Sequence, residues 1–152
     1  MYSKQEAACL RQEFWTTFGQ YIKPVPSAGP EKVQWINYKT HVRYINFKMK
    51  ADDHSAYIAI EFSHPSTEQR IIYFEHLRQL KKTFEKFIVG KWIWQEDVMV
   101  EYTWVSRTYT EITDINIYKK SDWPELISFF KIGITGIDRF WAKHKEIFEM
   151  IG

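Results

Sequence analysis

The chain has 152 residues, the length of one domain, and we treat 1–152 as a single folding unit. Its 21 Lys and Arg residues against 19 Asp and Glu residues give a formal net charge of +2, which is too balanced to indicate a nucleic-acid-binding protein by charge alone. The single cysteine excludes an internal disulfide, and an aromatic content of 18% predicts a bulky core, or rings that line a groove or a self-association surface.

The first predicted element is a helix over about Ser3–Tyr21. Ser3 and Glu6 have the spacing of a capping box, in which each side chain accepts from the backbone amide of the other. Cys9 lies beside apolar residues of this helix, so we expect a buried, unreactive thiol. Three prolines between residues 24 and 30 then predict a loop. Within the predicted helix, apolar residues recur at helical spacing, namely Leu10, Phe14 and Phe18.

The next region predicts three strands. Val33–Tyr38 has the composition of a short strand, and residues 42–62 predict a β-hairpin around the turn-forming residues 52–55. Pairing about that turn places the large apolar side chains on one face, because side chains alternate along a strand. The expected opposite pairs are Met49 with Ile58, Phe47 with Ile60, and Ile45 with Phe62. The other face then carries Asn46, Lys48, Lys50, Tyr57, Ala59 and Glu61.

A second helix is predicted to start at Ser66, which forms another capping box with Gln69. Its apolar stripe continues to Ile88, and Gly90 suits the C-terminal cap. A helix of this length could cover the apolar face of the hairpin.

Residues 91–120 predict two or three further strands. Trp92–Trp94 is typical of a strand, and Val98–Val105 is apolar at both odd and even positions, so it is either a buried or a bulged strand. Thr108–Ile112 and Ile115–Tyr118 are rich in residues that favour strands.

The last predicted element is a helix from Asp122, its expected cap, with Pro124 in the first turn. Its apolar stripe continues to Phe148, but Gly133 and Gly136 interrupt it. Either the helix breaks or kinks at these glycines, which we favour, or the two small residues admit a close neighbour.

The element order is therefore α-βββ-α-ββ(β)-α. Grouped strands joined by hairpins predict an α+β fold, an antiparallel sheet of about five strands with the helices mainly on one face. The charged residues at Lys4, Glu6 and Arg11 do not fit a signal peptide, and no apolar stretch is long enough to span a bilayer. We expect a soluble cytoplasmic protein.

Glu61 invites comparison with restriction-type nucleases, in which an acidic residue and a Glu-x-Lys pair bind a divalent metal. Ser63 stands where that lysine would be. Asp52 and Asp53 are placed about 20 Å along the hairpin, too far away to share an ion, and Glu13 is the only other acid we can suggest. We therefore expect no metal site and no cofactor. Glu61 is the one weak catalytic candidate, with a polar residue of the open sheet face as the favoured alternative.

A binding surface is better supported than a catalytic site. Lys39, Arg43 and Lys48 cluster with Tyr44 and Tyr57 on the second predicted strand, its approach and its partner. Lysines and tyrosines on a sheet face can hold phosphates and stack bases. The alternative is that the lysines solvate an exposed face and protect its edge.

Aromatic and acidic residues recur at short spacings along nearly the whole chain: Phe14-Trp15, Tyr57–Glu61, Phe74–Leu77, Trp92–Trp94, Ser106-Arg107, Asp122–Leu126 and Asp138–Trp141. This pattern resembles a bacterial family, the domain of unknown function DUF 4268. The resemblance implies an association with DNA-processing systems and no catalytic set. It also draws attention to Glu61 and Arg107, which form either a structural ion pair or part of a binding site.

Three functions remain open. The first is a non-catalytic binding or interaction module of bacterial DNA-processing or defence systems, with nucleic acid or a nuclease as its partner and with Lys39, Arg43, Tyr44, Lys48, Tyr57, Glu61 and Arg107 as binding residues. The second is a divergent or degenerate restriction-type nuclease. The third is a structural homo-oligomerisation domain; a homodimer through an aromatic surface is also considered for the binding module.

Overall fold

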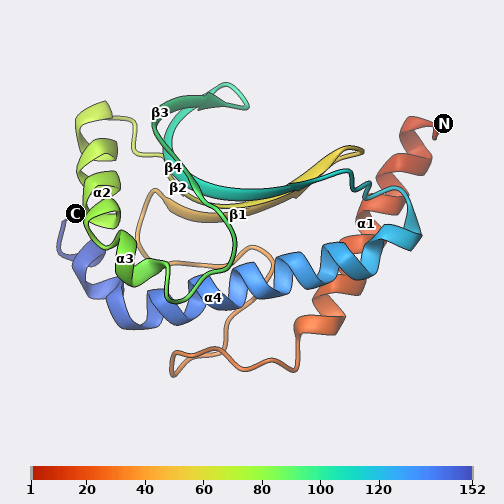
Figure 1. Cartoon of the computed structure of the whole chain (residues 1–152), viewed down its shortest axis with the longest axis horizontal. Helices are drawn as coiled ribbons and strands as arrows, with labels where there is room; N and C mark the ends of the chain where they lie inside the picture. Colours follow the sequence, from red (N-terminus) through yellow and green to blue (C-terminus); the bar gives the residue numbers. More distant parts are fainter. Residues whose placement is uncertain (1, 152) are drawn as a thin grey trace.

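The computed structural model describes residues 2–151 and has four α-helices and a four-stranded antiparallel sheet of order β1-β2-β4-β3 (Figure 1). The α+β class is confirmed, with four strands in place of about five. Among the described residues, none of the helices combines the length and the apolar character needed to cross a bilayer. The elements are α1 (Lys4–Ile22), β1 (Ile45–Ala51), β2 (Ser55–Phe62), α2 (Thr67–Gln79), α3 (Lys81–Phe84), β3 (Ile93–Val100), β4 (Thr103–Thr113), the short 3-10 helix η1 (Lys120–Asp122) and α4 (Trp123–Glu149).

The hairpin of β1 and β2 has the predicted register. Phe47 is opposite Ile60 and Ile45 is opposite Phe62, and all four side chains are buried. Because residues that are directly opposite share a face, this register fixes one face of the sheet as the floor of the core.

The helix that covers this floor is α4, and the prediction that the helix starting at Ser66 would do so is wrong. That helix ends at Gln79, and Leu80 separates α2 from the single turn α3. Its 13 residues span only about 20 Å, and α2 lies at one end of the sheet (Figure 1). The 27 residues of α4 span about 40 Å and run beneath the strands.

The predicted break in the last helix is also wrong, and the alternative of a close neighbour is right. α4 continues through both glycines because each faces a tightly packed partner. A Cβ atom at Gly133 would lie 2.9 Å from Cδ1 of Ile58, and one at Gly136 would collide with the carbonyl oxygen of Phe87. Close packing against the sheet and the segment after α3 therefore outweighs the low helix propensity of glycine.

Two predicted strands are absent from the described residues. Val33–Tyr38 is part of a loop, in which Asn37 has a left-handed backbone (φ 59°) that is incompatible with an extended strand. Ile115–Tyr118 is irregular, although the amides of Ile115 and Ile117 donate to backbone carbonyls of the β1–β2 turn, and both side chains are buried.

Val98–Val105 is not one strand but the tip of a hairpin. The chain reverses at Glu101 and Tyr102, which both have positive φ values (49° and 67°), as a tight two-residue hairpin turn requires.

Capping was predicted with mixed success. The capping box of Ser3 and Glu6 is present, and the Ser66 hydroxyl accepts from the Gln69 amide. Asp122 does not cap α4, because its carboxylate accepts from the amide of Asn116 at 3.0 Å. The buried side chains of α1 all lie in its second half, so Cys9 is exposed, contrary to our prediction.

The β3–β4 hairpin curls over the face of the sheet opposite α4 (Figure 1). A bulge between Gln95 and Val98 shifts the register of β3 against β4, and bulges increase strand twist. The hairpin tip crosses β2, so that Glu101 Oε1 lies 3.7 Å from Lys50 Nζ on β1. Beneath it, Val105 is only 2% exposed. The face that we expected to be open is therefore partly roofed.

Candidate functional site: a basic groove beside strand β1

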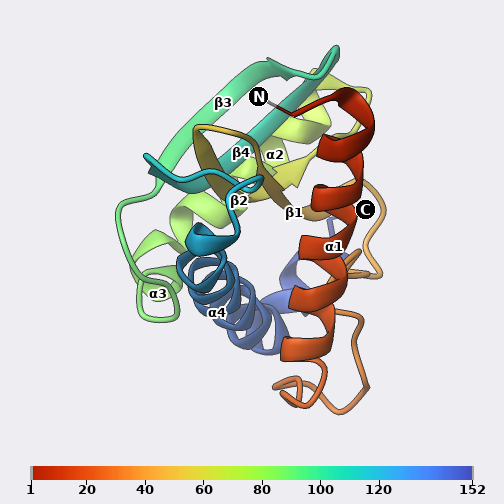
Figure 2. The same cartoon turned by 90° about the vertical axis from the view of Figure 1, so that its right-hand side faces the viewer.

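The segment from residue 23 to residue 44 has no regular structure, and α4 holds it in place. Asp138, only 2% exposed, accepts hydrogen bonds from the Tyr38 hydroxyl (2.5 Å), the Ser27 hydroxyl (2.8 Å) and the Ala28 amide (2.8 Å). Trp141 Nε1 donates to the carbonyl oxygen of Thr40 at 3.2 Å. These bonds fix a long loop as a firm wall next to the sheet. In Figure 2 this loop runs from the end of α1 back to β1, and α1 lies along the β1 side of the sheet.

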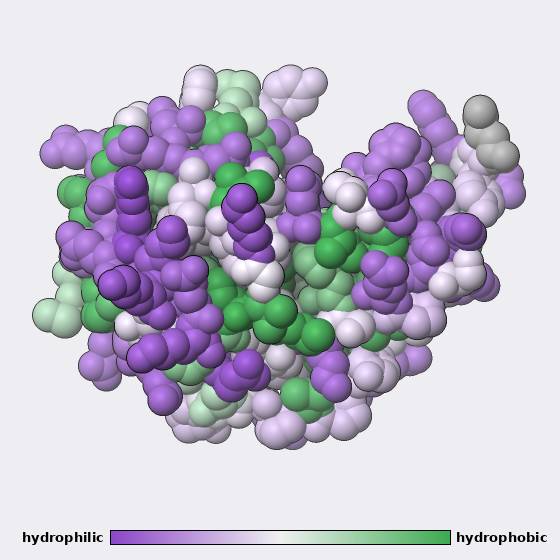
Figure 3. Space-filling model, viewed as in Figure 1, coloured by the Kyte–Doolittle hydropathy of each residue, from purple (hydrophilic) through white to green (hydrophobic). Residues whose placement is uncertain are grey.

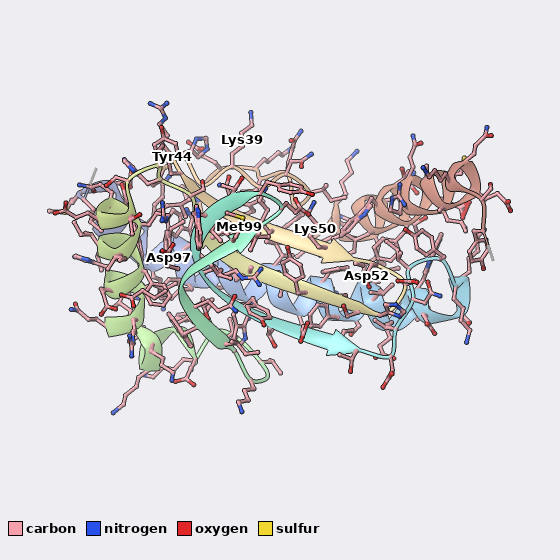
Figure 4. All side chains as sticks on the ribbon, turned by 90° about the horizontal axis from the view of Figure 1, so that it is seen from above. Lys39, Tyr44, Lys50, Asp52, Asp97 and Met99 are labelled. Atoms are coloured by element: carbon pink, nitrogen blue, oxygen red, sulfur yellow. The ribbon has the colours of Figure 1, made fainter. Side chains whose placement is uncertain are left out.

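Between this wall, α1 and β1 lies a groove of about 1050 Å³. From α1 it is lined by Ala8, Arg11, Gln12 and Trp15, and otherwise by residues 36–51. β1 is an edge strand, so one side of it is free of sheet partners among the described residues. Figure 4 looks onto the sheet from above, with Lys39 and Tyr44 beside β1 and Lys50 farther along toward α1. We call this site the β1 groove.

The β1 groove is strongly basic. Its twenty lining residues, all in the described part of the chain, include five Lys or Arg and no Asp or Glu. Arg43 packs over the ring of Tyr44 (4.7 Å) and Arg11 donates to the Tyr118 hydroxyl (2.7 Å), so both have neutral partners that leave their charge uncompensated. Among the described residues, Lys50 pairs with Glu101 at the hairpin tip, and Lys48 is near enough to Glu61 for its charge to act on that carboxylate. The basic residues are Arg11, Lys39, Arg43, Lys48 and Lys50.

The edge of β1 presents free backbone groups to the groove. The Ser63 amide donates to the Tyr44 carbonyl, and the Asp52 amide donates to the Ser55 carbonyl. Because hydrogen-bonded and non-hydrogen-bonded pairs alternate in an antiparallel ladder, this pattern assigns the even-numbered residues of β1 to β2. Phe47 and Met49 therefore direct their N–H and C=O groups away from β2, and both residues line the groove.

A second cluster lies on the roofed face of the sheet, around Glu61. Glu61 is 5% exposed, and its Oε2 lies 3.8 Å from Arg107 Nη1 on the neighbouring strand. Arg107 Nε donates to Gln95 Oε1 (2.7 Å), and the guanidinium packs over the rings of Tyr109 (4.3 Å) and Tyr57 (5.4 Å). Within residues 2–151, Glu61 Oε2 has no hydrogen-bond partner. Burial raises the pKa of Glu61, and the nearby charges of Lys48 and Arg107 oppose that rise.

The other acids of the nuclease comparison lie elsewhere. Asp52 Oδ1 accepts from the amides of His54 and Ser55 within the hairpin turn. Glu13 pairs with Lys120 Nζ at 2.7 Å. The part of the chain that the structure describes contains no group of three or more His, Cys, Asp or Glu side chains arranged to hold a metal ion. The Glu61 cluster thus places one shielded carboxylate against an arginine.

The seven residues predicted for binding separate into two groups. Lys39, Arg43, Tyr44 and Lys48 line the β1 groove. Tyr57, Glu61 and Arg107 form the roofed cluster, and Lys48 connects the groups because its charge acts on Glu61. α1 also contributes Arg11, Gln12 and Trp15 to the groove, which was not predicted from the sequence. Arg11 and Trp15 are four residues apart and so share a helix face, but no pattern in the sequence shows that this face meets β1.

Comparison with curated proteins gives no match, and comparison with solved structures gives none. The family model described as "Domain of unknown function (DUF4268)" matches residues 10–145, which include the sheet, all of α2 and α3, and most of α1 and α4. On this match, the chain belongs to the DUF4268 family.

Proposed function

We propose that this protein is a non-catalytic binding module that holds a negatively charged partner in the β1 groove. The observation that carries the proposal is the charge of the lining, with five cationic side chains and no carboxylate among twenty residues. In a chain with a net charge of only +2, such segregation concentrates positive potential in one concave place. Lys39 and Arg43 are exposed at one end of the groove, where an anionic partner can reach them.

The proposal includes a role in bacterial DNA-processing or defence systems, which is the role that the family resemblance implies. A module of that kind would attach a larger assembly to its partner without doing chemistry. The buried position of Glu61, which is only 5% exposed, supports a non-catalytic role.

Binding of labelled polyanions to matched charge variants tests the proposal. The probes are a short fluorescein-labelled single-stranded DNA and a fluorescein-labelled peptide rich in glutamate. The groove variant combines Lys39→Glu with Arg43→Glu. The control combines Lys81→Glu with Lys82→Glu, which changes the net charge equally on the exposed surface of α3. We expect the groove variant to weaken binding of at least one probe about tenfold, with a steep salt dependence for the wild type. Equal effects of the two double variants, or no binding of either probe, would overturn the proposal.

A second candidate function is self-association through the β3–β4 hairpin. Four large apolar side chains are exposed there: Ile93 (40%), Met99 (49%), Tyr102 (97%) and Trp104 (51%). Met99 and Trp104 are directly opposite in the ladder and so form one apolar patch. Light scattering should then give a mass above the 18.4 kDa of one chain, and Met99→Ser with Trp104→Ser should restore the single-chain mass. A wild-type mass of one chain at high concentration would reject this candidate.

A further inference from the structure

The free edge of β1 indicates which kind of partner could bind in the groove. Resting on the proposed function, we propose that the partner is an extended acidic segment of another protein, which pairs with β1 as an additional strand. Strand addition to a sheet edge draws affinity from main-chain hydrogen bonds and specificity from alternate side chains. The β1 groove supplies both the free edge and charges of one sign.

The two edges of the sheet differ in how well they suit an added strand. β3, the opposite edge, is interrupted by a bulge between Gln95 and Val98. Such a bulge disrupts the regular row of backbone N–H and C=O groups with which an added strand would pair. β1 pairs with β2 over seven consecutive residues without a shift in register. Its outward N–H and C=O groups at Phe47 and Met49 would give four hydrogen bonds to an added strand. The wall of the groove leaves room beside them, since residues 45–51 all line the space.

The register also predicts the pattern of the partner. The side chains of Lys48 and Lys50 lie on the hairpin-covered face of the sheet, opposite the face of Phe47 and Met49. Residues of an added strand on the lysine face would lie next to these two cations, within about 5.5 Å between Cβ atoms. Residues on the other face would meet the apolar lining, which includes Trp15 and Ile36. The matching segment therefore alternates acidic and apolar residues.

The aromatic residues of the groove favour a peptide over a nucleic acid. Single strands of nucleic acid bind by stacking bases on free aromatic faces. Trp15 packs against Phe14 and Phe130, with ring centroids 5.1 Å away in both cases. The Tyr44 ring contacts Arg43 (4.7 Å) and His64 (4.7 Å), and the Tyr38 hydroxyl is bonded to Asp138. These rings are therefore already engaged with other groups of the protein.

Lysines on an edge strand also protect that edge against unwanted pairing, so the experiment must separate a docking site from a protected edge. The probe is a fluorescein-labelled peptide of alternating glutamate and valine, long enough to span the seven residues of β1. Two further peptides carry N-methyl groups on alternate residues, one on the set that faces β1 and the other on the set that faces away. Only the first set removes donors that β1 needs, because backbone groups alternate in direction along a strand.

We expect the plain peptide and the peptide that is N-methylated on the set facing away from β1 to bind alike. The peptide that is N-methylated on the set facing β1 should bind at least about tenfold more weakly. On the protein side, Met49→Pro removes the outward amide, whereas Met49→Ala removes the same side chain and keeps the amide. Proline is tolerated on an edge strand where the N–H faces outward. Met49→Pro should therefore weaken binding relative to Met49→Ala while both variants stay folded.

The outcomes separate this inference from the proposed function. Loss of peptide binding in the Lys39→Glu, Arg43→Glu variant together with equal binding of both N-methylated peptides would overturn strand addition and leave an anion-binding groove. Binding of single-stranded DNA without binding of the peptide would reject the peptide as the partner. Absence of binding for every probe would reject the proposed function as well. If Met49→Pro does not fold, the N-methylated pair still decides.

Discussion

The Tyr38 hydroxyl donates a 2.5 Å hydrogen bond to Oδ1 of Asp138, which connects the wall of the β1 groove to the buried middle of α4. Burial and this carboxylate both raise the pKa of Tyr38, so the phenol stays protonated and keeps donating. Ser27 and the Ala28 amide donate to the same side chain. One carboxylate therefore positions both ends of a loop that has no regular structure of its own.

Replacing Asp138 should accordingly loosen the groove wall. We expect Asp138→Ala to lower the free energy of unfolding by about 3 kcal/mol, because it leaves buried donors without an acceptor. Tyr38→Phe removes one of these bonds and should lower it by only about 1 kcal/mol. Urea denaturation measures both values. Equal losses for the two variants would show that Asp138 does not act as a shared acceptor.

The tip of the β3–β4 hairpin should be strained. Glu101 and Tyr102 hold positive φ values without being glycine or asparagine, and a left-handed backbone costs such residues about 1–2 kcal/mol each. Tyr102→Gly should therefore raise the stability, whereas Tyr102→Ala, which removes the same exposed ring but keeps a Cβ atom, should not. Thermal unfolding of the two variants compares them. A lower melting temperature for Tyr102→Gly than for Tyr102→Ala would contradict this account.

Packing at Gly136 should reverse the usual effect of a helical glycine-to-alanine change. Alanine favours a helix by about 1 kcal/mol over glycine, but a Cβ atom at Gly136 would meet the backbone carbonyl of Phe87. We therefore expect Gly136→Ala to destabilise the protein. Gly19→Ala serves as the control, because its Cβ atom would lie 3.2 Å from the movable end of the Ile36 side chain and should be neutral or stabilising. Stabilisation by both variants would refute the close packing of α4.

Glu61 should make stability depend on pH in a defined direction. Burial raises its folded-state pKa above the ordinary 4.5, so the folded protein holds this proton more tightly than the unfolded chain does. The stability that this proton contributes is complete below pH 4.5 and is lost as the pH rises through the folded-state pKa. Wild type should thus lose stability relative to Glu61→Gln as the pH is raised.

Denaturation of both proteins at a series of pH values measures this difference, with Glu111→Gln, an exposed residue of β4, as the control for loss of one negative charge. A difference between wild type and Glu61→Gln that stays constant with pH, or shrinks as the pH rises, would contradict the account.

The elements that sequence analysis predicts well are those whose signals are local. The β1–β2 hairpin combines strict alternation with a cluster of turn residues, so its register follows from neighbouring residues alone, as the pair Phe47 and Ile60 shows. The start of α1 at Ser3 likewise depends on side chains three residues apart.

The wrong predictions have tertiary causes. Gly133 and Gly136 weaken a helix locally, and only their contacts with Ile58 and Phe87 explain why α4 is unbroken. The turn at Glu101 and Tyr102 lacks the Asn-Gly or Asp-Gly signal of tight hairpins, so two short strands resemble one continuous apolar run.

The candidate site shows the same difference between features that local sequence predicts and features that depend on tertiary contacts. Lys39, Arg43 and Lys48 are close in sequence, and the clustering alone predicts a basic surface there. That this surface is a groove depends on α1 and on the bond between Tyr38 and Asp138, which join residues 100 positions apart. Figure 3 shows a notch in the outline of the molecule between the β3–β4 hairpin and the N-terminal part of α1.

The most direct test of strand addition at the β1 groove is amide hydrogen exchange, followed by NMR, with and without the alternating glutamate–valine peptide. Exchange at an exposed edge amide slows when its N–H gains a hydrogen-bond partner. The account predicts that the amides of Phe47 and Met49 become protected when the peptide is added, while those of Lys48 and Lys50, already paired with β2, change little. Protection that appears on β3 alone, or unchanged exchange at Phe47 and Met49 with the peptide bound, would contradict it.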